Sequence, residues 1–271
     1  MNKKALFLDL DGTLLNDRRE ITDGNRSAIC QALEMGHKII INTGRPLVSA
    51  LKQAEILGLT SEGCYLIAYN GGILYDIAEH RVISRSTLPL HLVRAVFAEA
   101  NRRGIHVQTY SETEVLVEPR CDDEGVRRYC DKILMTYRVI PDVRELQEEP
   151  VKVLYLDYYD QEPLREFKKW IDAQFGDSLD TFFSCKEYVE VVPKGLNKGN
   201  ALLEMASLLG IPVEHTVAAG DEANDEMMIR AAGVGVCMRN GTEALKAIAD
   251  YVTERDNNQD GIREIIEKFL L

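Results

Sequence analysis

The sequence predicts an α/β protein in which a doubly wound parallel sheet is interrupted by an inserted α+β domain. Short apolar runs such as Ala5–Leu8 and Lys38–Asn42 predict strands that are buried on both faces. Helical segments separate these runs, and a βαβαβ order favours a parallel sheet with right-handed crossovers. The order in which strands and helices alternate changes near Leu88, and the first order resumes near Val192. A length of 271 residues accommodates one large domain or two smaller ones.

The first segment supplies three strands and two helices before a short hairpin. Thr22 is expected to cap the first helix, and Gly36 to end it. Pro46 suits the first turn of the second helix, which extends to about Gly58. The strands are expected at 5–8, 38–42 and 65–69, and the hairpin pairs 73–75 with 82–84.

The middle segment alternates strands with helices in a different order, which favours a small α+β domain with an antiparallel sheet. Its helices are expected at 90–103, 122–134 and 163–175, and its strands at 106–110, 114–117, 151–156, 181–183 and 188–191. The sequence therefore predicts a core domain formed by residues 1–84 and 192–271, with residues 85–191 as the insert.

The last segment again alternates strands with helices as the first segment does, and it completes the core domain. Strands are expected at 216–219, 233–238 and 251–252. Helices are expected at 200–209, 226–232, 242–249 and 261–271.

Composition excludes several classes of partner. The formal net charge of −12 makes a nucleic acid or an anionic membrane surface a poor partner. No apolar stretch approaches the length of a membrane span, and the N-terminus does not resemble a signal peptide. The six cysteines include no Cys-x-x-Cys pair, which is typical of a reduced cytoplasmic protein. The oligomeric state stays open between a monomer and a weak dimer.

Polar side chains follow four of the expected parallel strands, where ligands bind in open α/β sheets. They are Asp9 and Asp11 after the first strand, Thr43 and Arg45 after the second, Asn70 after the third, and Asp221, Asn224 and Asp225 after the strand at 216–219. Lys198, at a helix start, can reach the same edge. Carboxylates gathered at one edge require a cation, and an all-oxygen set of ligands favours Mg²⁺.

Four motifs, in order, resemble those of the haloacid dehalogenase-type phosphohydrolase superfamily. Asp9–Leu14 matches its Asp-x-Asp-Gly-Thr-Leu motif, and Thr43 matches the Thr or Ser that follows a hydrophobic strand. Lys198 matches the Lys before a helix, and Gly220–Asp225 matches the Gly-Asp-x-x-Asn-Asp motif. The insert resembles the type IIB αβ cap of the Cof-type, sugar-phosphatase-like branch, and Asn70-Gly71-Gly72 resembles a loop of that branch.

The resemblance implies a role for each matched residue. Asp9 would be the nucleophile that forms an aspartyl-phosphate, and Asp11 the general acid and then base. Mg²⁺ would be held by the Asp9 side chain, the Asp11 backbone carbonyl and Asp221, with Asp225 in support. The groups expected to bind phosphate or substrate are Thr43, Gly44, Arg45, Asn70, Lys198 and Asn224. Arg45 is equally compatible with an exposed structural residue, and Asn224 would either contact the phosphate or hold its loop.

These features together predict a Mg²⁺-dependent phosphatase on a Rossmann-like core. Its substrate would be a small phosphorylated metabolite such as a sugar phosphate, whose leaving group the cap would select. Two alternatives stay open: a phosphotransferase or phosphomutase, in which the aspartyl-phosphate passes to a second substrate, and a binding or regulatory protein without turnover.

Overall fold

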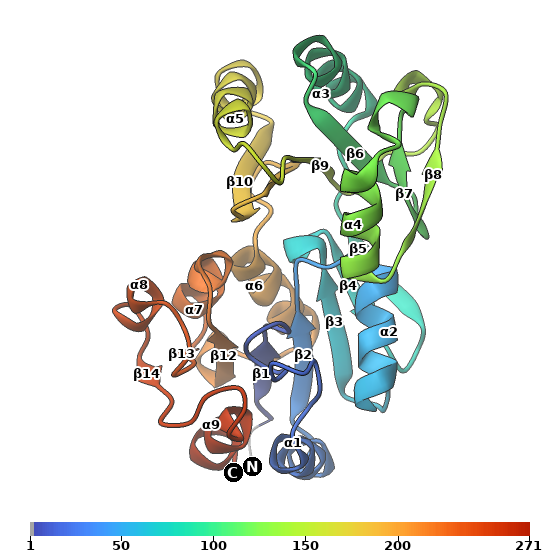
Figure 1. Cartoon of the computed structure of the whole chain (residues 1–271). Helices are drawn as coiled ribbons and strands as arrows, with labels where there is room; N and C mark the ends of the chain where they lie inside the picture. The colour runs from blue at the N-terminus through green and yellow to red at the C-terminus, as the bar shows by residue number, and fades with distance from the viewer. Residues whose placement is uncertain (1–2) are drawn as a thin grey trace. The chain divides into compact units, whose positions relative to one another are not determined.

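The computed structural model describes residues 3–271, which form two compact units. The first contains the residues up to Gly44 together with Ala50–Ser84 and Asn197–Leu271. The second contains Arg45–Ser49 and Arg85–Leu196. Each unit has its own sheet (Figure 1).

Among the described residues, the sheet of the first unit has the strand order β14-β13-β12-β1-β2-β3-β4-β5. The six strands from β14 to β3 run parallel, and β4 is antiparallel to β3. The bounds are β1 Ala5–Leu8, β2 Lys38–Asn42, β3 Cys64–Ala68, β4 Ile73–Asp76, β5 Arg81–Arg85, β12 Thr216–Gly220, β13 Val234–Cys237 and β14 Tyr251–Val252. The predicted parallel sheet is confirmed.

Helices cover both faces of this sheet. Phe7 and Ile40 pack in an apolar cluster with Leu202 and Met205 of α6, while the alternate residues such as Ile41 are buried too. Helices α1 and α9 pack against each other, at the bottom of the view in Figure 1. The bounds are α1 Asp23–Glu34, α2 Leu47–Leu57, α6 Lys198–Leu208, α7 Glu226–Ala231, α8 Glu243–Lys246 and α9 Gly261–Phe269. As predicted, the Thr22 side chain caps α1, where it accepts a hydrogen bond from the Asn25 backbone N–H.

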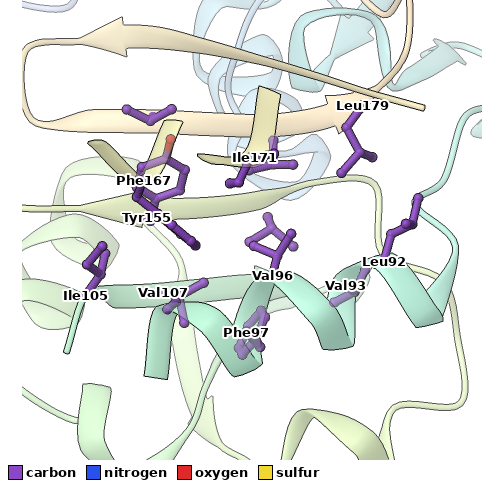
Figure 2. Packing of buried hydrophobic residues seen from close by; sticks show 14 of the residues in the cluster. Leu92, Val93, Val96, Phe97, Ile105, Val107, Tyr155, Phe167, Ile171 and Leu179 are labelled. Atoms are coloured by element: carbon purple, nitrogen blue, oxygen red, sulfur yellow. The ribbon is translucent and has the colours of Figure 1, made fainter. Parts of the chain in front are cut away.

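The described part of the second unit contains a six-stranded sheet in the order β10-β11-β9-β6-β7-β8. Figure 2 shows its apolar core, in which Phe97 of α3 and Phe167 of α5 pack with Val107 and Tyr155 of the sheet. The strands are β6 His106–Tyr110, β7 Glu114–Val117, β8 Thr136–Val139, β9 Val153–Leu156, β10 Leu179–Cys185 and β11 Tyr188–Pro193. The helices are α3 Leu90–Arg103, α4 Glu124–Ile133 and α5 Glu162–Phe175.

The sequence did not predict β8, which pairs in parallel with β7 in an otherwise antiparallel sheet. Its four residues are mostly exposed, so they carry no apolar alternation from which an edge strand could be recognised. Helix α8 is also shorter than expected.

Short 3₁₀ turns join several elements: η1 Tyr69–Gly71, η2 Pro119–Cys121, η3 Val143–Glu145, η4 Val213–His215 and η5 Ala223–Asp225. Within residues 3–271, no helix has both the length and the apolar character needed to cross a bilayer.

Candidate active site

The carboxyl ends of neighbouring parallel strands place the predicted residues of the first unit in a row. Strand β1 lies between β12 and β2, with Leu8 opposite both Ala219 and Ile41. The backbone continues this order beyond the strands: the N–H of Asp9 donates to the Ala219 carbonyl at 3.0 Å, and the N–H of Asn70 donates to the Thr43 carbonyl at 3.0 Å. Residues far apart in sequence are thereby brought to one edge of the sheet, as predicted from the strand ends.

Three carboxylates gather at this edge in the described chain. Oxygens of Asp9, Asp221 and Asp225 all lie within 4.8 Å of one another, and all three residues are buried. The Lys198 ammonium contacts two of them, with 2.5 Å from Nζ to Asp9 Oδ1 and 2.6 Å to Asp225 Oδ1. One buried ammonium therefore faces three carboxylates, which leaves an excess of negative charge.

Burial, together with this charge imbalance, changes the proton affinities of the cluster. Burial raises the pKa of Asp9 well above its usual value; Lys198 opposes this shift, whereas Asp225 and Asp221 add to it. Burial also raises the pKa of Asp221 to about 7, against the opposing hydrogen bond from Thr13 and with a further contribution from Asp225. Burial alone would lower the pKa of Lys198, but Asp225 and Asp9 raise it overall. A buried set of oxygen donors with raised pKa values fits a divalent cation.

A ring of hydrogen bonds fixes the cluster in place. The Thr13 hydroxyl donates to Asp221 Oδ1 at 2.8 Å. Asp225 Oδ2 accepts from the backbone N–H groups of Asp221 and Glu222, at 3.0 and 3.1 Å. Because its other oxygen contacts Lys198, Asp225 links the loop after β12 to the ammonium; its role in metal support stays a prediction.

Lys198 is held at the start of α6 by two asparagines. The Asn197 side chain caps the helix by accepting from the N–H groups of Gly199 and Asn200, both at 2.9 Å. Asn42, at the end of β2, donates to the Lys198 carbonyl at 3.0 Å. The ammonium is thus directed from a rigid first turn.

The backbone conformation and the close packing of Gly12 exclude a residue with a side chain. Its φ is +86°, and a Cβ there would lie 2.3 Å from Asp221 Oδ2. The glycine of the first motif therefore lets the β1 loop approach the carboxylate after β12.

The other predicted residues take different positions. Asp11 is exposed and lies outside the carboxylate cluster, although it is on the same loop as Asp9. Thr43 is buried, and Gly44 lies so near Asn70 that a Cβ would be 3.0 Å from its side-chain amide. Asn224 is half-buried in η5. Arg45 belongs to the second unit, so its expected contact with substrate stays a prediction.

Two contributors had no role in the sequence reasoning. Thr13 lies within the first motif, and its hydroxyl donates to Asp221. Asn42 ends the strand predicted at 38–42; its side-chain amide donates to the Lys198 carbonyl and lies 3.3 Å from the Met228 sulfur. A polar residue that ends an apolar run such as Lys38–Ile41 was the available signal, because a buried amide needs partners.

Comparison with known proteins agrees with the resemblance. The family model of haloacid dehalogenase-like hydrolases matches residues 6–266. Pyridoxal phosphate phosphatase YbhA of Escherichia coli is 29% identical over 278 residues, which cover 100% of both chains.

Two solved structures also match over nearly their full length. A haloacid dehalogenase-like hydrolase from Bacteroides thetaiotaomicron has a TM-score of 0.89 at 29% identity, covering 98% of this chain and 99% of that one. The sugar phosphatase BT4131, of HAD subclass IIB, has a TM-score of 0.80 at 26% identity, covering 99% of this chain and 100% of that one. The chain belongs to the haloacid dehalogenase-like hydrolase family, in its Cof-type branch, and is a phosphatase.

Proposed function

We propose that the protein is a Mg²⁺-dependent phosphatase that hydrolyses small phosphorylated metabolites, sugar phosphates foremost, through an aspartyl-phosphate on Asp9. The observation that carries this proposal is the buried cluster of Asp9, Asp221 and Asp225 around Lys198. An all-oxygen set of ligands favours Mg²⁺ over softer metals. The Asp9 and Asp221 side chains and the Asp11 backbone carbonyl would hold it, with Asp225 in support.

The reaction proceeds in two transfers. An Asp9 oxygen attacks phosphorus as the bond to the leaving oxygen breaks, and Asp11 gives its proton to the departing alkoxide. Asp11, now a carboxylate, then takes a proton from water, whose oxygen attacks the phosphorus of the aspartyl-phosphate. Inorganic phosphate leaves, and the carboxylate of Asp9 and the proton of Asp11 are restored.

Charge governs both transfers. The phosphoryl group carries negative charge on its equatorial oxygens, so catalysis depends on positioning and neutralisation. The divalent cation, when bound, supplies positive charge to those oxygens. Within the chain, Lys198 favours the ionised form of the nucleophile Asp9, in opposition to burial, and would bind phosphoryl oxygens together with Thr43. The remaining groups proposed to bind phosphate or substrate are Gly44, Arg45, Asn70 and Asn224.

The leaving group is the part that differs between substrates, and we propose that residues 85–191 form a cap domain that selects it. The relatives support this division: one is named for pyridoxal phosphate and another as a sugar phosphatase. Their leaving groups differ, whereas the phosphoryl group is shared. A cytoplasmic location and a monomeric or weakly dimeric state stay predictions.

Phosphate release from p-nitrophenyl phosphate tests the reaction class. We expect release with Mg²⁺, none with excess chelator, and restoration when Mg²⁺ is added back. A panel of sugar phosphates and other phosphorylated metabolites then identifies the substrate class. Release that requires an added alcohol or sugar acceptor would instead identify a phosphotransferase, and no turnover of any phosphate ester would favour a binding protein.

The covalent step has its own test. Acid quenching during turnover of a ³²P-labelled substrate should leave label on the protein, and the label should be absent in D9N. An unlabelled wild-type protein during active turnover would contradict the aspartyl-phosphate.

A further inference from the structure

Two further parallel strands end at the same edge of the sheet as β1, and an asparagine follows each. Asn240 follows β13, and its Nδ2 donates to the Gly12 carbonyl at 2.7 Å. Asn257 follows β14, and its Nδ2 donates to the Leu15 carbonyl at 3.0 Å. The two are joined, because the Asn257 backbone N–H donates to Asn240 Oδ1 at 3.1 Å. Side chains from the C-terminal part thus hold two carbonyls of the loop after β1.

That loop is a tight turn which carries Asp11. The N–H of Leu14 donates to the Asp9 carbonyl at 3.3 Å, and the N–H of Leu15 donates to the Leu10 carbonyl at 2.9 Å. Asp11 is exposed, and the backbone of this turn sets where its side chain begins. The next residue, Gly12, has the greatest conformational freedom of any residue type and takes a positive φ. A donor that fixes the Gly12 carbonyl therefore restricts the peptide adjoining Asp11.

The segment that carries Asn240 is itself anchored at the site. The N–H of Thr242 donates to the Asp221 carbonyl at 2.9 Å. The N–H of Arg239 donates to the Thr253 hydroxyl at 2.9 Å. Asn240 is therefore presented from a backbone that is tied on one side to the loop of the carboxylate cluster and on the other to the segment after β14.

We infer that Asn240 is a positioning residue for Asp11: by holding the Gly12 carbonyl, it keeps the carboxyl of Asp11 aligned with the leaving oxygen. The inference rests on the proposed role of Asp11 as general acid. Proton transfer requires a short, directed hydrogen bond in the transition state. A poor leaving group such as an alkoxide depends on that proton far more than p-nitrophenolate does. Loss of the Asn240 contact should therefore affect alkyl phosphates more than aryl phosphates.

The experiment compares kcat/KM for glycerol 2-phosphate and p-nitrophenyl phosphate, since this parameter reports on the transfer to Asp9. In N240D the side chain keeps its size and the oxygen that accepts from Asn257, but it loses the donor to Gly12. N240A removes both contacts without adding charge. We expect both variants to lower kcat/KM about tenfold for the alkyl phosphate and less than about threefold for the aryl phosphate.

Two further variants make the result decisive. N258A is the matched control, because Asn258 lies on the same segment but contacts Asp17 and Asn257 rather than the Gly12 carbonyl. D11N should show the same preference more strongly. An equal loss for both substrates in N240D and N240A, no loss, or the same preference in N258A would overturn the inference about Asn240. If D11N lowers kcat/KM equally for both substrates, Asp11 is not the general acid, and the inference about Asn240 is then wrong as well.

Discussion

Each unit of the protein contains a lysine that is almost fully buried, but the two lysines have different surroundings. Lys198, in the first unit, contacts Asp9 and Asp225, with Asp221 close by. Lys152, in the second, pairs with Glu190 at 3.1 Å, and its ammonium lies 5.3 Å from the centroid of the Tyr110 ring.

The surroundings of the two lysines distinguish a candidate reactive site from a buried ion pair that stabilises the second unit. Lys152 and Glu190 form a pair of equal and opposite charges, so the pair requires no further ion to balance it. In the first unit three carboxylates share one ammonium, and the pKa values of Asp9 and Asp221 rise as a consequence of burial and mutual repulsion. Burial of an unbalanced cluster costs stability, and it is this imbalance that prepares a site for a cation and a phosphoryl group.

The largest effect is expected from Asp9. Asp9→Asn removes the proposed nucleophile but leaves the fold able to form, so we expect kcat to fall by at least about 10³-fold. The measurement is phosphate release under saturating p-nitrophenyl phosphate. D23N, the same change at an exposed position in the first turn of α1, is the control and should retain full activity. Activity of D9N within tenfold of wild type would contradict the assignment of the nucleophile.

The lysine of the second unit should matter for stability instead. Lys152→Met leaves the Glu190 carboxylate buried without its partner, which costs about 3–5 kcal/mol. Trp170 is the only tryptophan in the sequence and packs against the apolar core of this unit. Its fluorescence during denaturant unfolding therefore reports on the second unit.

A double variant sharpens this test. K152M/E190L replaces both charges by apolar side chains, so it should recover most of the loss. Two outcomes would show that the Lys152–Glu190 pair does not stabilise the second unit. One is an unchanged unfolding midpoint in K152M, and the other is a double variant that is no more stable than the single one.

The central strands of the first sheet could be predicted most directly, because they are buried on both faces. Strands β1 and β2 are continuous apolar runs that end in polar residues, so both their extent and their chemistry could be read directly. The gathering of Asp9 and Asp221 followed from the rule that parallel strands end at one edge. Strand β8 escaped prediction because its exposed residues obey no such pattern.

Contacts between side chains were harder to predict than strand ends. Nothing in the sequence indicates that Asn42 holds the carbonyl of Lys198, since 156 residues separate them and only the folded sheet brings them together. Asn240 and Asn257 were missed for another reason: the strands before them are short, and neither asparagine belongs to a motif that indicates a site.

A smaller effect is expected on metal affinity. Asp221→Asn removes one of the three carboxylates, so Mg²⁺ should bind at least about tenfold more weakly in titration calorimetry. Because the pKa of Asp221 is raised to about 7, protons compete with the cation below that pH. Wild-type affinity should therefore be about tenfold weaker at pH 6 than at pH 8. Equal affinities of D221N and wild type would exclude Asp221 as a ligand.

The smallest effect concerns pH and has opposite signs in the two units. In the metal-free protein, the raised pKa of Asp221 makes the folded state bind a proton that the unfolded state has lost. The contribution of Asp221 to stability therefore falls as pH rises from about 4 to about 7. In the second unit, burial lowers the pKa of His106, although Asp123, 3.2 Å from its Nδ1, partly opposes the shift.

The contribution of His106 is therefore present above its unfolded pKa of about 6.5 and is lost as pH falls through the unfolded value towards the folded one. His106→Gln removes this titration and keeps a polar side chain of similar size. Denaturant unfolding followed by Trp170 fluorescence should show that the advantage of wild type over H106Q shrinks between pH 7.5 and pH 5.5. A constant or growing advantage would mean that His106 accepts its proton at least as readily in the folded second unit as in the unfolded chain.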